Sequence, residues 1–277
     1  MSLDTGVPHA IPPPRPNTLC SVEFAGVGRS FGTDRGDGTG RHLVVRDVTL
    51  AIAPGEVVAI LGTSGCGKST LLRVAGGLDR PSTGTVQIDR TTVAGIDPRC
   101  AVAFQEPRLL PWRSLESNVS VGLPAGTVRA TGAARVAELL DLVGLTGFER
   151  HRPREVSVGM AQRASLARAL ARNPGVLLLD EPFAALDALT RLRMQDLLLD
   201  VHAAAPTTVL LVTHDVDEAL QLADRVVLIG QEAGRDGATV RQVLTVPGER
   251  PRDRGSAELA ELRATLLAGL GIDRHTH

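Results

Sequence analysis

The chain has 277 residues, of which 43% are hydrophobic and 22% are charged, and its 30 basic residues nearly balance 31 acidic ones. The apolar content excludes a disordered chain, and the net charge of −1 gives no electrostatic reason to expect a nucleic-acid partner. Aromatic residues make up only 2%, so Leu, Val and Ala must build the core. The three cysteines, Cys20, Cys66 and Cys100, lack the spacing of disulfide pairs or metal ligands, as is typical of a protein in a reducing compartment.

No stretch of the sequence approaches the roughly 18 apolar residues that a membrane-spanning helix needs. The first 20 residues lack the charged start and apolar stretch of a secretory signal, and their prolines predict a flexible tail over residues 1–19. We therefore expect a soluble, intracellular protein.

The first half of the chain combines aliphatic strand patterns with one helix. Strands are expected at Val22–Phe24, Leu43–Ile52, Val57–Leu61 and Thr85–Ile88, with a Gly-rich loop, Gly32–Gly40, between the first two. A helix is expected from Lys68 to Ala75, because the pair Gly76–Gly77 would end it.

The second half predicts a helical stretch and then a return to alternating strands and helices. Residues 107–171 contain few aliphatic runs, and helices are clearest at Ala133–Val143 and Gln162–Arg172. Strands then follow at Val176–Leu179, Val209–Val212 and Val226–Ile229, with helices at Ala188–Ala204, Val216–Leu222 and, as an amphipathic C-terminal element, Ser256–Leu270. Uninterrupted aliphatic strands alternating with helices predict a mostly parallel α/β sheet that is covered on both faces.

A phosphate-binding loop is the clearest functional signal. Residues 62–69 match G-x-x-x-x-G-K-[ST] directly after a predicted strand and at the start of a helix. Glycines let backbone N–H groups surround phosphate oxygens, the lysine can reach the β- and γ-phosphates, and the serine hydroxyl can coordinate Mg²⁺. The candidate nucleotide-binding residues are Gly62, Thr63, Ser64, Gly65, Cys66, Gly67, Lys68, Ser69 and Thr70.

Polar residues follow two further aliphatic strands at the ends that would face the same crevice. Asp180 is expected to hold Mg²⁺ and Glu181 to polarise the attacking water. An acidic turn after a core strand is common on its own, but beside a phosphate loop the catalytic interpretation is favoured. His214 ends the next strand and could donate to the γ-phosphate, whereas the other six histidines are predicted to lie on the surface.

With these motifs in order, the chain resembles the ATP-binding subunit of an ATP-binding cassette (ABC) transporter over nearly all of residues 20–270. The further motifs are the glutamine loop Phe104-Gln105-Glu106, the signature segment Val156–Arg163 and Ala184-Ala-Leu-Asp187. The resemblance implies a P-loop NTPase cassette with a mostly parallel core sheet, an antiparallel β subdomain and an inserted helical subdomain. It also implies ATP and Mg²⁺ as cofactors, Gln105 near the metal and the attacking water, and Phe31 stacked on the adenine.

The same resemblance suggests a domain division, a dimer and a transport role. Residues 20–235 would form the cassette, with the helical subdomain at about 107–171, and residues 236–277 a C-terminal extension. Each ATP would lie between one subunit's phosphate loop and Ser157 and Gly159 of a second ATPase subunit, either another copy or a related chain. The chain would lie peripherally at the cytoplasmic face of the membrane, against integral permease subunits that an extracytoplasmic substrate-binding protein supplies.

Two segments resemble importers of the nitrate, sulfonate and taurine type: Phe104–Arg113, with an exposed corner expected at Trp112, and Arg250–Arg254. The signature departs from the family's usual Leu-Ser-Gly-Gly-Gln, because Val158 places a β-branched side chain where the family has none, just before a helix expected to begin near Gly159. A partly degenerate cassette with weak activity, paired with another ATPase subunit, is therefore an alternative.

Two other classes are disfavoured. Cassettes of DNA repair or translation usually carry tandem cassettes or long coiled-coil insertions, and this chain shows one cassette with near-zero charge. A GTPase would need an Asn-Lys-x-Asp segment, which the sequence lacks, and a small-molecule kinase would need neither the signature nor the histidine.

Overall fold

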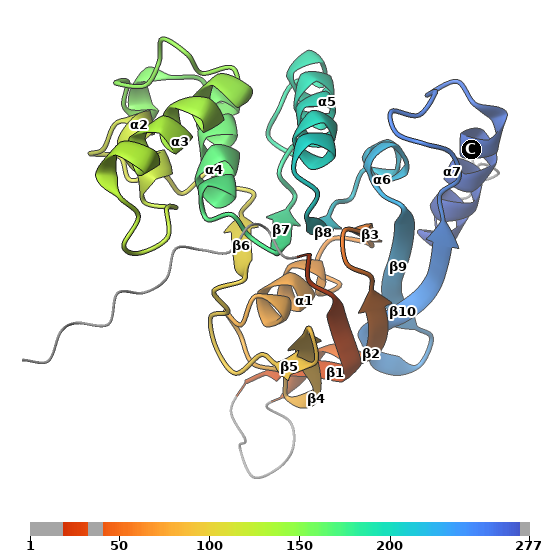
Figure 1. Cartoon of the computed structure of the whole chain (residues 1–277). Coiled ribbons are helices and arrows are strands. Elements are labelled where there is room, and N and C mark those ends of the chain that lie inside the picture. The colour runs from red at the N-terminus through yellow and green to blue at the C-terminus, as the bar shows by residue number, and fades with distance from the viewer. Residues whose placement is uncertain (1–18, 33–40, 272–277) are drawn as a thin grey trace, which may run out of the picture.

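The computed structural model describes residues 19–32 and 41–271, and the predicted tail over residues 1–19 lies almost wholly outside these ranges. One ten-stranded sheet runs through the molecule in the order β5-β4-β1-β2-β10-β9-β3-β8-β7-β6 (Figure 1). The strands are β1 (Val22–Phe31), β2 (His42–Ile52), β3 (Val57–Leu61), β4 (Thr83–Ile88), β5 (Thr91–Thr92), β6 (Cys100–Ala103), β7 (Val176–Asp180), β8 (Thr208–Val212), β9 (Arg225–Glu232) and β10 (Arg235–Thr245).

The sheet has a parallel part and an antiparallel part. Strands β9, β3, β8, β7 and β6 are parallel neighbours, so their carboxyl ends share one edge. Strands β2, β1, β4 and β5 pair antiparallel, and β10 joins the two parts by pairing antiparallel with β9 and parallel with β2. The predicted combination of a mostly parallel core with an antiparallel β subdomain is confirmed.

Both faces of the parallel strands are buried, as their unbroken aliphatic sequences predict. In β3, Val57, Ala59 and Leu61 enter one hydrophobic cluster, whereas Val58 and Ile60 enter the other. The helices are α1 (Lys68–Ala75), α2 (Leu115–Ser120), α3 (Arg129–Leu142), α4 (Val158–Ala171), α5 (Ala188–Ala204), α6 (Val216–Leu222) and α7 (Ala257–Gly269).

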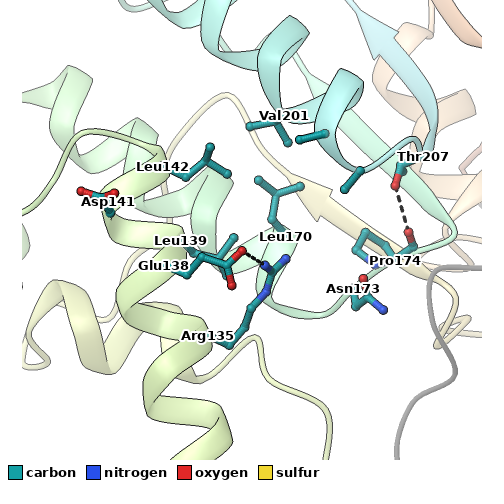
Figure 2. A pocket seen from close by; sticks show the side chains of 12 residues that line it. Arg135, Glu138, Leu139, Asp141, Leu142, Leu170, Asn173, Pro174, Val201 and Thr207 are labelled. Atoms are coloured by element: carbon teal, nitrogen blue, oxygen red, sulfur yellow. Dashed lines mark hydrogen bonds and ion pairs between the residues drawn. The ribbon is translucent and has the colours of Figure 1, made fainter.

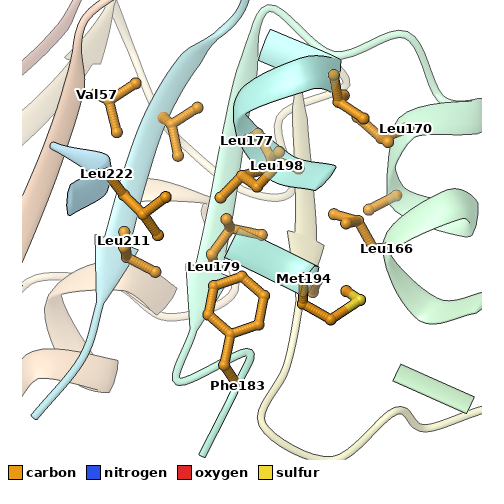
Figure 3. Packing of buried hydrophobic residues seen from close by; sticks show 14 of the residues in the cluster. Val57, Leu166, Leu170, Leu177, Leu179, Phe183, Met194, Leu198, Leu211 and Leu222 are labelled. Carbon is orange, nitrogen blue, oxygen red and sulfur yellow. The ribbon is translucent and has the colours of Figure 1, made fainter. Parts of the chain in front are cut away.

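The two clusters place the helices on opposite faces of the sheet. Residues of α1 share their cluster with the antiparallel strands. The other cluster packs α2–α7 against the parallel strands, and Figure 3 shows Phe183 and Met194 beside the strand residues Leu179 and Leu211. No helix in the described ranges is long and apolar enough to cross a bilayer.

Helices α2, α3 and α4 gather at one side of the molecule (green in Figure 1). Figure 2 shows a pocket of about 260 Å³ where α3 and the chain after α4 face α5. An Arg135–Glu138 ion pair of 2.8 Å lies on its wall, and Thr207 Oγ1 donates to Pro174 O at 3.3 Å. None of residues 62–70 lines this pocket, so it is separate from the phosphate loop.

The structure corrects several predicted bounds. Strand β1 continues to Phe31. Strands β5, β6 and β10 were not predicted, because β5 and β6 are short and β10 has no aliphatic run. Helix α4 begins at Val158, next to the start expected near Gly159 and four residues before Gln162, because the Ser157 hydroxyl accepts the Met160 N–H and caps the helix there.

Two further expectations of the sequence concern histidines and the C-terminal segment. His151 and His202 are half-buried rather than on the surface, and His202 Nε2 lies 3.0 Å from Thr207 O. The C-terminal helix is confirmed as α7, with Leu259 and Leu266 buried against the core. Strand β10 belongs to the central sheet although it falls in the segment assigned to the C-terminal extension, and the domain boundaries stay a prediction.

One carboxyl group lies in the interior at the start of α6. Glu218 is 3% exposed, and its Oε1 has no hydrogen-bond partner among the described residues. Burial raises the pKa of Glu218 to about 8, and the negative charge of Asp215 adds to the rise, whereas Arg191 and a Thr213 hydrogen bond oppose it. The folded protein therefore holds Glu218 in its neutral form at pH values at which an unfolded chain would ionise it.

We expect Glu218→Gln to stabilise the protein increasingly as pH rises. Below the unfolded pKa of 4.5, Glu218 is protonated in both the folded and the unfolded state. Between pH 4.5 and about 8 only the folded state keeps this proton, so the wild type loses stability as pH rises. The amide of the variant does not titrate, so the variant does not lose stability in this way. The gain in free energy of unfolding should reach about 1–4 kcal/mol at pH 8. Urea unfolding from pH 5 to 8 measures it. The exposed Glu258→Gln serves as control, and a pH-independent difference for Glu218→Gln would contradict the prediction.

Candidate nucleotide site

An open groove of about 360 Å³ lies where the loop after β3 meets the ends of β6 and β7. The residues that line it are Val44, Ser64, Gly65, Gly67, Lys68, Ser69, Thr70, Gln105 and Glu181. The structure therefore brings together residues that the sequence separates by more than a hundred positions. Val44, from β2, is the one lining residue that sequence analysis missed, because an aliphatic strand residue carries no chemical signal.

The phosphate loop needs glycine at two positions for steric reasons. Gly67 has a φ of 96°, and a Cβ there would lie 2.9 Å from side-chain carbons of Val44 and Val45. A Cβ on Gly62 would lie 2.6 Å from both Cys66 Sγ and Ile229 O. The backbone is thus held close to its neighbours, leaving its outer side open to the groove. Burial raises the pKa of the Cys66 thiol, so this cysteine packs as a neutral group.

Lys68, at the first position of α1, is 5% exposed but not locked to a carboxylate. Its ammonium donates to Gly62 O at 2.8 Å and Thr63 O at 3.1 Å, while Glu181 Oε1 lies at 3.9 Å. These two carbonyls belong to the loop itself. The charge is therefore held over the loop by neutral acceptors that phosphate oxygens could replace with stronger, charge-assisted bonds.

Ser69 and Asp180 join the phosphate loop to β7. Ser69 Oγ donates to Asp180 Oδ1 at 2.7 Å, and Asp180 is 5% exposed. A hydroxyl and a carboxylate oxygen are the hard ligands that Mg²⁺ prefers, and Gln105 contributes an amide oxygen to the same groove. Ser69, Asp180 and Gln105 therefore fit an Mg²⁺ ion, in agreement with the expectation from the sequence.

Glu181 and His214 form a pair at the carboxyl ends of β7 and β8. Glu181 Oε2 lies 3.2 Å from His214 Nδ1, and the His214 side chain is 58% exposed toward the open side. Glu181 adopts a φ of 46°, and its N–H donates to Val212 O at 2.9 Å. A left-handed glutamate is uncommon and costs conformational energy, and such strain is concentrated at functional sites.

The segment around Gln105 is tied to α4. Gln162 Nε2 donates to Phe104 O at 3.1 Å, and Arg168 donates to Pro107 O and Arg108 O, each at 2.8 Å. These contacts hold the exposed Gln105 between the groove and the helical subdomain. Sequence analysis gave no role to Gln162, although it lies in the signature segment Val156–Arg163, and it missed Arg168, which occurs within an ordinary helical pattern.

The remaining candidates lie outside the groove. Ser157 and Gly159 are at the amino end of α4, and Val158 between them is 57% exposed. Phe31 ends β1 opposite His42, is 42% exposed, and has the Arg29 guanidinium 4.3 Å above its ring. Neither Phe31 nor the two signature residues line the groove, and their proposed contacts with ATP stay predictions.

Comparison with known proteins finds relatives that agree with one another in family and in name. A sequence model described as ABC transporter matches residues 45–184. The aliphatic sulfonates import ATP-binding protein SsuB 1 of Xanthomonas axonopodis pv. citri is 46% identical over 247 residues, which are 88% of this chain and 93% of that protein. The Rhodococcus jostii protein of the same name is 49% identical over 252 residues, 91% of this chain and 94% of its own length.

A solved structure agrees with this relationship. The ATP-binding cassette MJ0796, described as dimeric in a post-hydrolysis state bound to ADP and Pi, is 30% identical, with a TM-score of 0.70. The match covers 82% of this chain and 100% of that one. Similarity of this extent, in sequence and in structure, shows that the chain belongs to the ABC transporter family, as an ATPase that couples hydrolysis to transport.

Proposed function

We propose that this ATPase energises the import of aliphatic sulfonates. The proposal is supported by the relatives described above, which are named for aliphatic sulfonate import; none of them is named for nitrate or taurine. Permease subunits would contact the corner at Trp112, which is 68% exposed, and a substrate-binding protein would deliver the sulfonate from outside. The chain would lie at the cytoplasmic face of the membrane.

The single observation that carries hydrolysis is the row of polar groups from Lys68 through Glu181 to His214, with distances of 3.9 and 3.2 Å. Lys68 and the loop N–H groups would bind the β- and γ-phosphates. Glu181 would orient a water molecule and accept its proton, and His214 would donate a hydrogen bond to the γ-phosphate. Ser69, Asp180 and Gln105 would hold Mg²⁺, which neutralises developing phosphate charge when bound.

The exposed signature supports a dimer in which Ser157 and Gly159 of one subunit reach the ATP of the other. The solved relative MJ0796 is described as dimeric. The partner would be a second copy or a related ATPase subunit. Val158 favours a second candidate function, a weakly active cassette, because its exposed side chain lies where the other subunit's nucleotide would approach.

Lys68→Ala should weaken ATP binding at least about tenfold, because charge-assisted bonds to phosphate are lost. Isothermal titration measures the dissociation constant. Lys68 is also the one lysine in the sequence, so amine labelling of the peptide that contains it, resolved by mass spectrometry from labelling of the α-amino group, reports on it. ATP should protect it from labelling in the wild type. Unchanged affinity, or labelling that ATP does not slow, would contradict the phosphate-loop assignment.

Glu181→Gln should keep ATP binding but lower turnover about 100-fold or more, because the amide cannot accept the proton from water. ATP should then accumulate in a dimer that size-exclusion chromatography detects. In vesicles with the permease and binding protein, wild type should take up labelled ethanesulfonate, and the variant should not. Uptake of nitrate in preference to ethanesulfonate would overturn the proposed substrate class. A monomeric, fully active variant would overturn the role of Glu181.

Val158→Gly should raise ATPase turnover roughly twofold or more, a barrier change of about 0.4 kcal/mol, by removing the β-branched side chain from the subunit interface. ATP affinity of the monomer should not change, since Val158 lies outside the groove. Because Val158 opens α4, glycine there also weakens the first helical turn, by up to about 1 kcal/mol. Steady-state turnover and thermal midpoints separate the effects. Equal turnover, alone and with a candidate partner subunit, would show that the valine is tolerated.

A further inference from the structure

Arg191, in the first turn of α5, joins two segments that lead away from the groove. Its Nη1 donates to Asp215 Oδ2 at 3.1 Å, and its Nη2 donates to Leu186 O at 3.2 Å. Its own N–H donates to Asp187 O at 2.8 Å, so the base of the side chain is held by the helix. One guanidinium thus bonds to both the segment after β7 and the segment after β8.

Asp215 directly follows His214 and is fixed from three directions. Its Oδ1 accepts the Glu218 N–H at 3.1 Å as the cap of α6, its Oδ2 accepts from Arg191, and its N–H donates to Thr213 Oγ1 at 3.0 Å. The His214 ring is 58% exposed, and among the described residues its recorded contact is Glu181. The direction of the His214 side chain therefore depends on its backbone, which Asp215 holds.

Leu186 connects Arg191 to Glu181, as Asp215 connects Arg191 to His214. The Ala184 N–H donates to Glu181 O at 3.2 Å, the Leu186 N–H donates to Phe183 O at 3.1 Å, and the Leu186 side chain is 6% exposed. The carbonyl that Arg191 binds thus belongs to a hydrogen-bonded turn that starts at Glu181. Arg191 therefore holds the segments that carry both members of the Glu181–His214 pair.

We propose that Arg191 is a positioning residue for hydrolysis, which keeps His214 in register with Glu181 through Asp215 and Leu186. A planar fork with donors on two separate nitrogens suits this task, because a lysine ammonium carries all its donors on one nitrogen at the end of a flexible stem. The buried Nε of Arg191 has no hydrogen-bond partner among the described residues, so the side-chain hydrogen bonds of Arg191 go to these two acceptors. The proposal rests on the assigned roles of Glu181 and His214.

The test compares Arg191→Met, Arg191→Lys and Asp215→Asn in the full chain, with Arg193→Met as matched control, since Arg193 is an exposed arginine on the same helix. We expect Arg191→Met to lower kcat at least about tenfold, with KM and the ATP dissociation constant within about twofold of wild type. Arg191→Lys should be intermediate, because it keeps the charge without the fork, and Arg193→Met should match wild type.

Non-additive effects on kcat in double variants distinguish a positioning role of Arg191 from an effect on the stability of the protein. In a His214→Ala background, Arg191→Met should lower kcat by a smaller factor than in wild type, because one of the two groups that it positions is gone, and Asp215→Asn should add little to Arg191→Met. Wild-type kcat for Arg191→Met, full additivity with His214→Ala, or a loss that follows the thermal midpoint would overturn the proposal. If Arg191→Met does not fold, Arg191→Lys and Asp215→Asn decide by the same criteria. Glu181→Gln is run alongside: normal turnover there refutes the catalytic assignment, whereas an inactive Glu181→Gln beside a fully active Arg191→Met refutes this inference alone.

Discussion

The parallel register of β3, β8 and β7 is the constraint on which the site depends. Ile60 pairs with Val212, and Val212 pairs with Asp180, so the carboxyl ends of the three strands lie level at one edge of the sheet. The phosphate loop, His214 and Glu181 each follow one of these ends. Without this register, the 2.7 Å bond from Ser69 to Asp180 and the 3.2 Å contact between Glu181 and His214 could not form together. The positions of the candidate site residues therefore depend first on the strand register and only then on the conformations of the loops.

Burial on both faces explains why the chemistry is confined to that edge. The parallel strands are aliphatic along their length, since a polar side chain on either face would be buried without water to bind it. Polar groups become tolerable only where the strands end and the groove opens. The cost of burying a charge is visible at Glu218 of α6, where burial raises the pKa of the carboxyl to about 8.

The sequence predicted those parts of the molecule that depend on local pattern. Buried strands such as Val57–Leu61 and the residues at their ends could be identified because aliphatic runs and the glycine-lysine spacing are short-range signals. Strand β10 could not, because its sequence, RDGATVRQVLT, has neither an aliphatic run nor a regular alternation of apolar and polar residues. Contacts such as that between Arg191 and Asp215, 24 positions apart, depend on how α5 packs beside α6, and arginine in a helix is ordinary in itself.

Helix α4 connects two parts of the candidate site within one chain: the signature residues and the segment around Gln105. Its amino end carries the exposed signature residues, while its later turns hold the segment around Gln105 through Gln162 and Arg168. Because these bonds go to backbone carbonyls, they fix the path of the Gln105 segment and not merely a side chain. A displacement of α4 would therefore carry the Gln105 segment with it.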